Sequence, residues 1–235
     1  MKSFVFWIFV LFASFAAVSV SAQQTIFNVP TADVLDRGKV YGELDVSFKT
    51  NCQEAVCRFS SFVPRVVVGT GGNVEVGLNV IRNIQPGADT TTLVPSIKWR
   101  FYQNKKKDWA LYGGNHFYIP VRNQSFNFGT HTYLAVAKTI NKTRLTAGGW
   151  VSSKDVFAPN AVRAGGLFGF EQTVNKYLNI NADWYTGRHA AGYFTPGVAI
   201  KATPRVTIYA GYSIGNADAA RGNHFFLVEL GYNFN

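Results

Sequence analysis

Four histidines are the residues of this sequence best suited to proton-transfer catalysis, because imidazole titrates near neutral pH. One class of lipid hydrolase carries a serine two residues after its histidine, and the P-loop, Asp-x-His and H-E-x-x-H patterns mark other enzymes. None of these patterns occurs around the histidines, which are followed two positions later by Tyr118, Tyr133, Ala191 and Phe226. The sequence therefore predicts no catalytic residues, no enzyme activity and no cofactor. His116 and His131 are expected to be ordinary polar residues near a loop rim.

Two cysteines lie close together in the polar stretch NCQEAVCRF. In an oxidising compartment Cys52 and Cys57 are expected to form a small local disulfide. Their spacing would also suit half of a metal site, but no second pair of cysteines exists to complete it. The sequence therefore predicts no metal site.

The N-terminus and the composition indicate export. Residues 1–22 combine one lysine, a long apolar run and small residues before a cleavage position, as a secretory signal peptide does. An uncleaved membrane anchor is the alternative. Charged residues make up only 15% of the chain, against about 25% in soluble domains. No second apolar run is long enough for a membrane helix, so the many aromatic side chains need another apolar environment.

The dominant pattern is alternation of apolar and polar residues, which is typical of strands. Counting these stretches predicts about twelve strands, with ten or fourteen possible. Most have ten to twelve residues, long enough to cross a bilayer when tilted. The predicted ranges are 37–48, 59–70, 73–82, 92–102, 109–119, 128–139, 143–152, 162–173, 177–186, 192–202, 205–215 and 223–234.

The connections alternate between long and short, which predicts a single up-and-down antiparallel barrel over residues 37–235 with tight turns at one end. Residues 23–36 are expected to form an N-terminal periplasmic segment, with Thr31 as N-cap of one short helical turn. The sequence does not decide whether this segment lies at the short-turn end or enters the barrel mouth.

The two faces of the predicted strands differ sharply in charge. The apolar face carries almost no charge, and Asn115 is its mid-strand exception, for which a bulge or a register shift could account. We therefore expect the apolar face to meet lipid and the polar face to line the lumen. The polar face carries six acidic and six basic candidates for lumen-lining residues: Glu43, Asp45, Arg65, Glu75, Lys98, Arg100, Arg144, Arg163, Glu171, Asp183, Lys201 and Glu229. They could pair across strands and fill the space, or line a solute path.

The remaining charge is mostly basic and lies on loops, turns and strand ends. Solvated loop charge is one interpretation, and contact with lipid or lipopolysaccharide phosphates at the outer rim is the other. Nucleic-acid binding is not predicted, since no basic helix or basic stretch with interleaved aromatics is present. Each long loop or its margin carries one base: Arg58, Arg82, Arg122, Lys154, Arg188 and Arg221.

The signal peptide, the alternating strands and the long and short connections together resemble a bacterial outer-membrane β-barrel, and the resemblance covers the whole mature chain. The last strand, FLVELGYNFN, resembles the C-terminal signal that the barrel-assembly machinery reads in that class, with Glu229, Gly231, Tyr232 and Phe234 as the matching residues. Members usually end on an aromatic residue, whereas this chain ends on Asn235.

The resemblance implies a monomeric porin-like channel in the outer membrane, through which small hydrophilic solutes diffuse along a narrow charged lumen. Balanced lumen charges argue against strong anion selectivity, although the whole chain carries a net charge of +10. The alternative is a non-conducting structural or surface barrel whose loops bind lipopolysaccharide or partner molecules. A barrel-embedded lipid hydrolase is less favoured, because its motif is missing.

Overall fold

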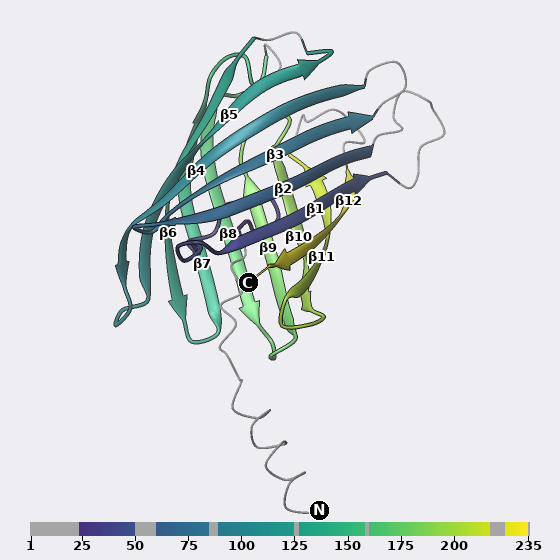
Figure 1. The fold of residues 1–235 in the computed structure, drawn as a ribbon. Coiled ribbons are helices and arrows are strands. Elements are labelled where there is room, and N and C mark those ends of the chain that lie inside the picture. Colours follow the sequence, from purple (N-terminus) through teal and green to yellow (C-terminus); the bar gives the residue numbers. More distant parts are fainter. Residues whose placement is uncertain are drawn as a thin grey trace, which may run out of the picture.

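The computed structural model describes residues 24–49, 60–84, 89–124, 127–157, 160–216 and 224–234. Its twelve strands are joined by antiparallel pairing into one closed barrel (Figure 1). They are β1 (Val40–Phe48), β2 (Ser60–Gly71), β3 (Val74–Ile84), β4 (Thr90–Asn104), β5 (Trp109–Arg122), β6 (Gly129–Ile140), β7 (Thr143–Ser152), β8 (Ala164–Thr173), β9 (Leu178–Tyr185), β10 (Tyr193–Lys201), β11 (Val206–Gly215) and β12 (Phe225–Asn233).

The predicted all-β, up-and-down architecture is confirmed, and every predicted strand end lies within three residues of the observed one. Each strand pairs with its neighbours in the chain, and β1 pairs with β12 to close the barrel. Because the cylinder closes, every strand has a partner on both sides, as hydrocarbon requires. Within the described ranges, no helix has the length and hydropathy that a membrane crossing needs.

The short connections follow β2, β4, β6, β8 and β10, so they all lie at one end of the barrel. Gly72 and Asn73 join β2 to β3 with φ angles of 63° and 58°. Positive φ at both positions is typical of a type I′ hairpin turn, whose twist matches that of the strands. The long connections lie at the opposite end, which is the extracellular end in barrels of this class.

Side-chain exposure along β12 shows which face meets the hydrocarbon. Phe226, Val228 and Leu230 are exposed, whereas Leu227 and Glu229 are buried. The same alternation runs around the barrel, so the apolar set predicted from the sequence faces outward. Asn115 also faces outward, opposite Thr132 on β6. Its amide nitrogen donates to the Thr132 hydroxyl at 2.8 Å, so a cross-strand hydrogen bond accounts for this polar residue, and the pairing has no register shift there.

The lumen is narrow enough for side chains and one chain segment to fill its middle. Buried tyrosines from several strands, among them Tyr41, Tyr112 and Tyr209, point inward together with Ile26 and Val29 from the N-terminal segment. No helix forms between residues 24 and 36, so the predicted helical turn capped by Thr31 is wrong. Instead the segment is held by side chains of the barrel wall. Residues 1–23 lie outside the described ranges, so the signal peptide and the domain boundaries stay predictions.

Gly231 has no side chain at a point where the Tyr41 ring crosses from β1 to β12. A Cβ atom at Gly231 would lie 2.2 Å from the Tyr41 hydroxyl oxygen and 3.0 Å from its Cζ atom. The ring is almost fully buried and hydrogen-bonds to Glu43, so it has little room to move. The glycine of the C-terminal pattern therefore has a packing role at the barrel seam.

We expect Gly231→Ala to lower the free energy of unfolding by about 1–3 kcal/mol, since overpacking displaces the buried ring. Urea unfolding of the refolded barrel in lipid vesicles would measure the loss. Gly149→Ala is the matched control, because its Cβ would meet only the Gly165 carbonyl oxygen at an ordinary 3.6 Å. Equal stability of the two variants would contradict the packing role.

Candidate functional site: a plugged, charged lumen

Residues 24–36, here called the plug, lie inside the ring of strands (Figure 1, dark purple). The backbone doubles back on itself through a bridge between Thr25 and Pro30, and the Ile26 amide donates to the Val29 carbonyl at 2.8 Å. Ile26, Phe27 and Val29 are buried against the lumen wall. Of the two positions that the sequence left open, the structure therefore places the segment within the barrel.

Asp183 on β9 is the central anchor of the plug. Its Oδ2 atom accepts hydrogen bonds from three successive backbone amides, those of Phe27, Asn28 and Val29, at 3.0, 2.5 and 2.7 Å. Consecutive N–H groups that converge in this way form an anion-binding concavity. Hydrogen bonds to an ionised acceptor each contribute about 1.5–3 kcal/mol, so this single carboxylate fixes the turn of the plug.

Other lumen side chains hold the plug along its length. Lys98 donates to the Gln24 side-chain oxygen at 3.1 Å, and the Leu35 amide donates to Glu75 at 3.0 Å. The hydroxyl of Tyr112 donates to the Pro30 carbonyl at 2.6 Å. Near the turn end, Arg144 pairs with Asp33 at 2.7 Å. These contacts come from several strands, so the plug is fastened around the circumference of the barrel.

Most of the lumen charges pair directly across neighbouring strands. Glu43 lies opposite Arg65 at 2.7 Å, Glu75 opposite Lys98 at 2.8 Å, and Arg144 opposite Glu171 at 2.5 Å. Arg65 also contacts Asp45 at 3.2 Å. A buried charge without a partner costs several kcal/mol, so such pairs are the condition for placing charge in a narrow barrel. This arrangement fits the interpretation in which the charges pair and fill the space.

Three of the predicted lumen residues lie nearer the barrel ends. Arg100 donates to the Ala32 carbonyl and to the Asn73 side chain near the turn end. Lys201 lines a small cavity at the same end. Arg163 precedes β8 and is exposed, so the structure places it outside the lumen. Extending the alternation of β8 back to Arg163 predicts an inward side chain. However, β8 begins only at Ala164, so Arg163 belongs to the preceding long connection.

The plug lies between two cavities lined by both polar and apolar side chains. The larger has a volume of about 720 Å³ and lies on the loop side, with Gln24, Thr25 and Phe27 of the plug among its lining residues. The smaller has a volume of about 230 Å³ and lies on the turn side, lined by Asp33, Arg144 and Lys201 among others. In this structure the plug therefore separates the two ends of the lumen.

An aromatic cluster on the loop side was not predicted. His131 stacks on Trp150 with ring centroids 5.4 Å apart, and Tyr185, Phe157 and His189 pack around this pair. Burial lowers the pKa of His189, opposed by its contact with the Thr186 carbonyl, so its ring is neutral at neutral pH. His131 is the third residue of β6, near the loop-side end of the barrel, and its side chain is buried inside the lumen. The alternation along the strands places His131, Trp150 and Tyr185 on the inward face, and this was the sequence signal from which the cluster could have been predicted.

Two serine arrangements bear on the expectation of no catalysis. Ser152 Oγ lies 3.4 Å from His131 Nδ1, but its hydroxyl also lies 3.1 Å from the Thr130 carbonyl, to which it donates. Residues 211–215 read GYSIG and match the G-x-S-x-G spacing of a nucleophile elbow. Ser213 lies inside β11 rather than at a strand–helix turn, and its Oγ contacts Thr195 at 3.0 Å. Neither serine has the geometry of an activated nucleophile.

Some sequence predictions concern residues that the structure does not describe. Cys52 and Cys57 lie outside the described ranges, as do Arg58 and Arg221. The C-terminal pattern is described up to Phe234: Glu229 and Gly231 face inward, and Tyr232 and Phe234 face outward. Its reading by the assembly machinery stays a prediction.

Comparison with known proteins identifies the fold only. No protein-family model matches the sequence, and no curated protein matches it. An outer-membrane channel from Pseudomonas putida F1 superposes with a TM-score of 0.56 at 11% identity, covering 86% of this chain and 97% of that one. Outer-membrane phospholipase A from Escherichia coli has a TM-score of 0.48 at 12% identity, covering 86% and 94%. The translocator domain of the autotransporter NalP from Neisseria meningitidis has a TM-score of 0.46 at 14% identity, covering 85% and 90%.

The closed barrel, its apolar outer surface and the channel from Pseudomonas putida F1 define the class of this protein. Its fold is that of the bacterial outer-membrane β-barrels, and the outer membrane is the location that this surface fits.

We expect Asp183→Ala to loosen the plug, because three backbone amides then lose a charged acceptor. Hydrogen–deuterium exchange of residues 27–29 should accelerate about 10- to 100-fold, corresponding to one or two lost hydrogen bonds to a charged group. Mass spectrometry of the N-terminal peptide measures the rate. Asp89→Ala is the control, since that loop-side carboxylate contacts only Arg82, at 3.9 Å, among the described residues. Unchanged exchange in Asp183→Ala would show that other contacts hold the plug.

Proposed function

We propose that this protein is an outer-membrane channel for small polar solutes, which the plug closes in the conformation described here. The observation that carries the proposal is the pair of cavities, about 720 and 230 Å³, that face each other across the plug within one continuous barrel and that charged side chains help to line. Displacing the plug would join them into a charged aqueous path. This proposal retains the porin-like function inferred from the sequence and adds a closed state.

The contacts of the plug support the idea that it can move out of the lumen. They are hydrogen bonds, ion pairs and side-chain packing, and its one β-bridge joins two of its own residues. The wall strands pair completely with one another, so the cylinder does not depend on plug backbone for its closure. Water and solute ions could replace the polar contacts of the plug. The Pseudomonas putida F1 protein with the same fold is described as a channel, which agrees with this function.

The lumen charges support weak selectivity. Six predicted acids lie in the lumen, whereas only five of the six predicted bases do so, because Arg163 is exposed. Asp33 of the plug adds a further acid when the plug is in place. Lys49 and Lys142 also line the two cavities, so the charges nearly balance, and we expect at most weak selectivity although the net charge of the whole chain is +10.

Conductance of the purified mature protein in planar bilayers tests the channel. We expect rare or brief openings of the natural protein and stable openings, with at least several-fold higher mean conductance, after deletion of residues 24–36. The reversal potential in a salt gradient should show at most weak selectivity.

A second variant controls for misfolding of the variant that lacks residues 24–36. Asp183→Ala combined with Asp33→Asn keeps the full chain and removes two anchors of the plug. Asp89→Ala should behave like the natural protein. Heat-dependent gel mobility reports folding. If both plug variants fold and remain silent, the barrel is not a channel, and the non-conducting surface barrel is the better reading.

The basic loop margins support a second role, contact with lipopolysaccharide. Arg82, Arg122, Lys154 and Arg188 are all exposed at the ends of loop-side strands or in loop-side connections. Cationic side chains at this level attract the phosphates of anionic head groups. This role is compatible with a channel and with a closed surface barrel, which in either case we expect to be monomeric.

Changing these four residues to glutamine should weaken retention of the barrel in lipopolysaccharide-containing vesicles, because phosphate attraction is lost. Sedimentation at increasing salt concentration measures it. Changing Lys105, Lys106, Lys107 and Lys142, four bases in turns at the opposite end, is the charge-matched control. Unchanged retention of the four-residue variant would mean that these bases are simply solvated.

A further inference from the structure

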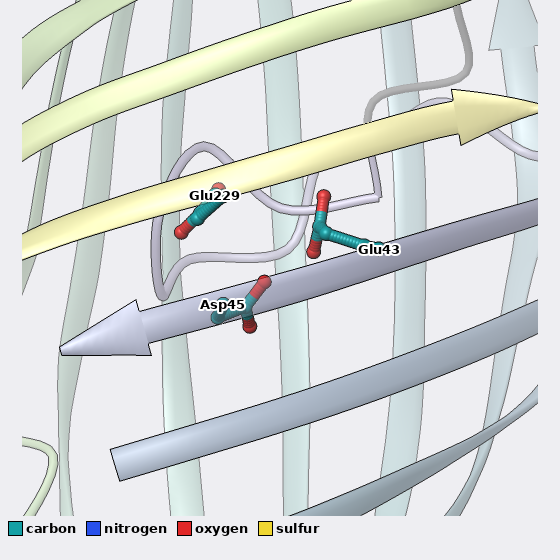
Figure 2. A group of neighbouring side chains, drawn as sticks. All are labelled: Glu43, Asp45 and Glu229. Carbon is teal, nitrogen blue, oxygen red and sulfur yellow. The ribbon is translucent and has the colours of Figure 1, made fainter. Parts of the chain in front are cut away.

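Three carboxylates meet inside the barrel where its first and last strands join. Glu43 and Asp45 extend from β1 and Glu229 extends from β12 toward the same region of the lumen (Figure 2). Asp45 and Glu229 are direct partners in the register of the seam. All three residues are buried, and Glu229 is only 1% exposed.

The described cations near this cluster do not balance its charge. Arg65 pairs with Glu43 at 2.7 Å and with Asp45 at 3.2 Å. The Tyr41 hydroxyl supplies a further donor to Glu43. Both carboxylate oxygens of Glu229 and the Oδ1 atom of Asp45 are buried and have no hydrogen-bond partner among the described residues. One guanidinium thus faces three carboxylates, and burying the unpaired charge is costly.

We propose that Glu43, Asp45 and Glu229 bind a divalent cation, with Ca²⁺ as the ion that fits best. One oxygen from each residue lies within 4.8 Å of the others. Two oxygens bound to one Ca²⁺ at about 2.4 Å can be at most about 4.8 Å apart, so this spacing is compatible with one shared ion. Calcium also accepts irregular, all-oxygen coordination more readily than magnesium. This proposal departs from the sequence-based expectation of no metal site.

The site can be reached from outside the barrel. Asp45 and Glu229 both line the 720 Å³ cavity on the loop side. An ion in this cavity lies beside the two residues that carry the unpartnered oxygens, and water within the cavity can complete the coordination. The proposal does not depend on conduction, because an ion can enter from the loop side while the plug stays in place.

A bound cation would also strengthen the closure of the barrel. Two ligands come from β1 and the third comes from β12. These are the one pair of neighbouring wall strands that are not consecutive in the sequence, so the ion would bridge the two ends of the barrel. Without the ion, the carboxylates of the two strands repel one another across the seam. Binding therefore stabilises the folded barrel by an amount that grows with the logarithm of the calcium concentration once this exceeds the dissociation constant.

Calcium binding to the refolded mature protein, in detergent without lipopolysaccharide, tests the proposal. Equilibrium dialysis with radioactive calcium at pH 7.5 should give one bound ion per chain at millimolar or lower concentration. Glu229→Gln should weaken binding at least tenfold. Asp89→Asn removes a carboxylate outside the lumen and should bind as the natural protein does. No saturable binding, or equal binding by Glu229→Gln, would overturn the proposal.

Thermal unfolding supplies an independent measurement that misfolding cannot imitate. Calcium should raise the unfolding temperature of the natural protein over that in a chelator, and should have little effect on Glu229→Gln. In the chelator, Glu229→Gln should be at least as stable as the natural protein, because an unpaired buried charge is removed. A proton bound to Glu229 could instead neutralise its unpaired charge. An infrared band of a neutral carboxylic acid that disappears in Glu229→Gln, together with no effect of calcium, would establish the proton and overturn the cation site.

Discussion

The closed ladder of backbone hydrogen bonds, with apolar side chains on its outside, is the constraint on which the rest of this structure depends. It leaves the charged side chains of the strands only the lumen. Little water reaches these charged side chains in the lumen, so each needs a partner that offsets its charge. Three cross-strand ion pairs, Glu43–Arg65, Glu75–Lys98 and Arg144–Glu171, are the direct result. The plug follows from the same constraint, because its backbone groups offer hydrogen bonds to lumen charges that the wall alone leaves unmatched.

Asp183 illustrates this complementarity. No cation pairs with it among the described residues, and three backbone amides of the plug take that place. Asp33 in turn supplies a second carboxylate to Arg144. The wall and the plug are thus polar counterparts, which explains how a thirteen-residue segment can be fixed without joining the sheet. Contacts of this kind are strong in a closed lumen but exchangeable with water, as the proposed opening of a channel requires.

The carboxylates at the seam are the part of the network that remains unbalanced. Where Glu75 and Glu171 each have a basic partner directly opposite, Glu229 lies between Asp45 on β1 and Tyr209 on β11. A cation at this point would complete the charge balance and bridge the two ends of the chain. The plug, the wall and the seam would then be stabilised by one principle, the pairing of charge within a space that apolar walls enclose.

The sequence alone determined the strands, their order, the end with short turns and the outward apolar face, because alternation with a period of two and the spacing of turns are local properties of the chain. It also identified eleven charges that the structure places in the lumen or at its turn end, and it misplaced Arg163, since the strand begins just after that residue. Only the tertiary structure decided where residues 24–36 lie, that Asp183 faces their amides, and that Asp45 faces Glu229. These contacts join residues up to 184 positions apart, as for Asp45 and Glu229. They depend on closure and register, which no local pattern records.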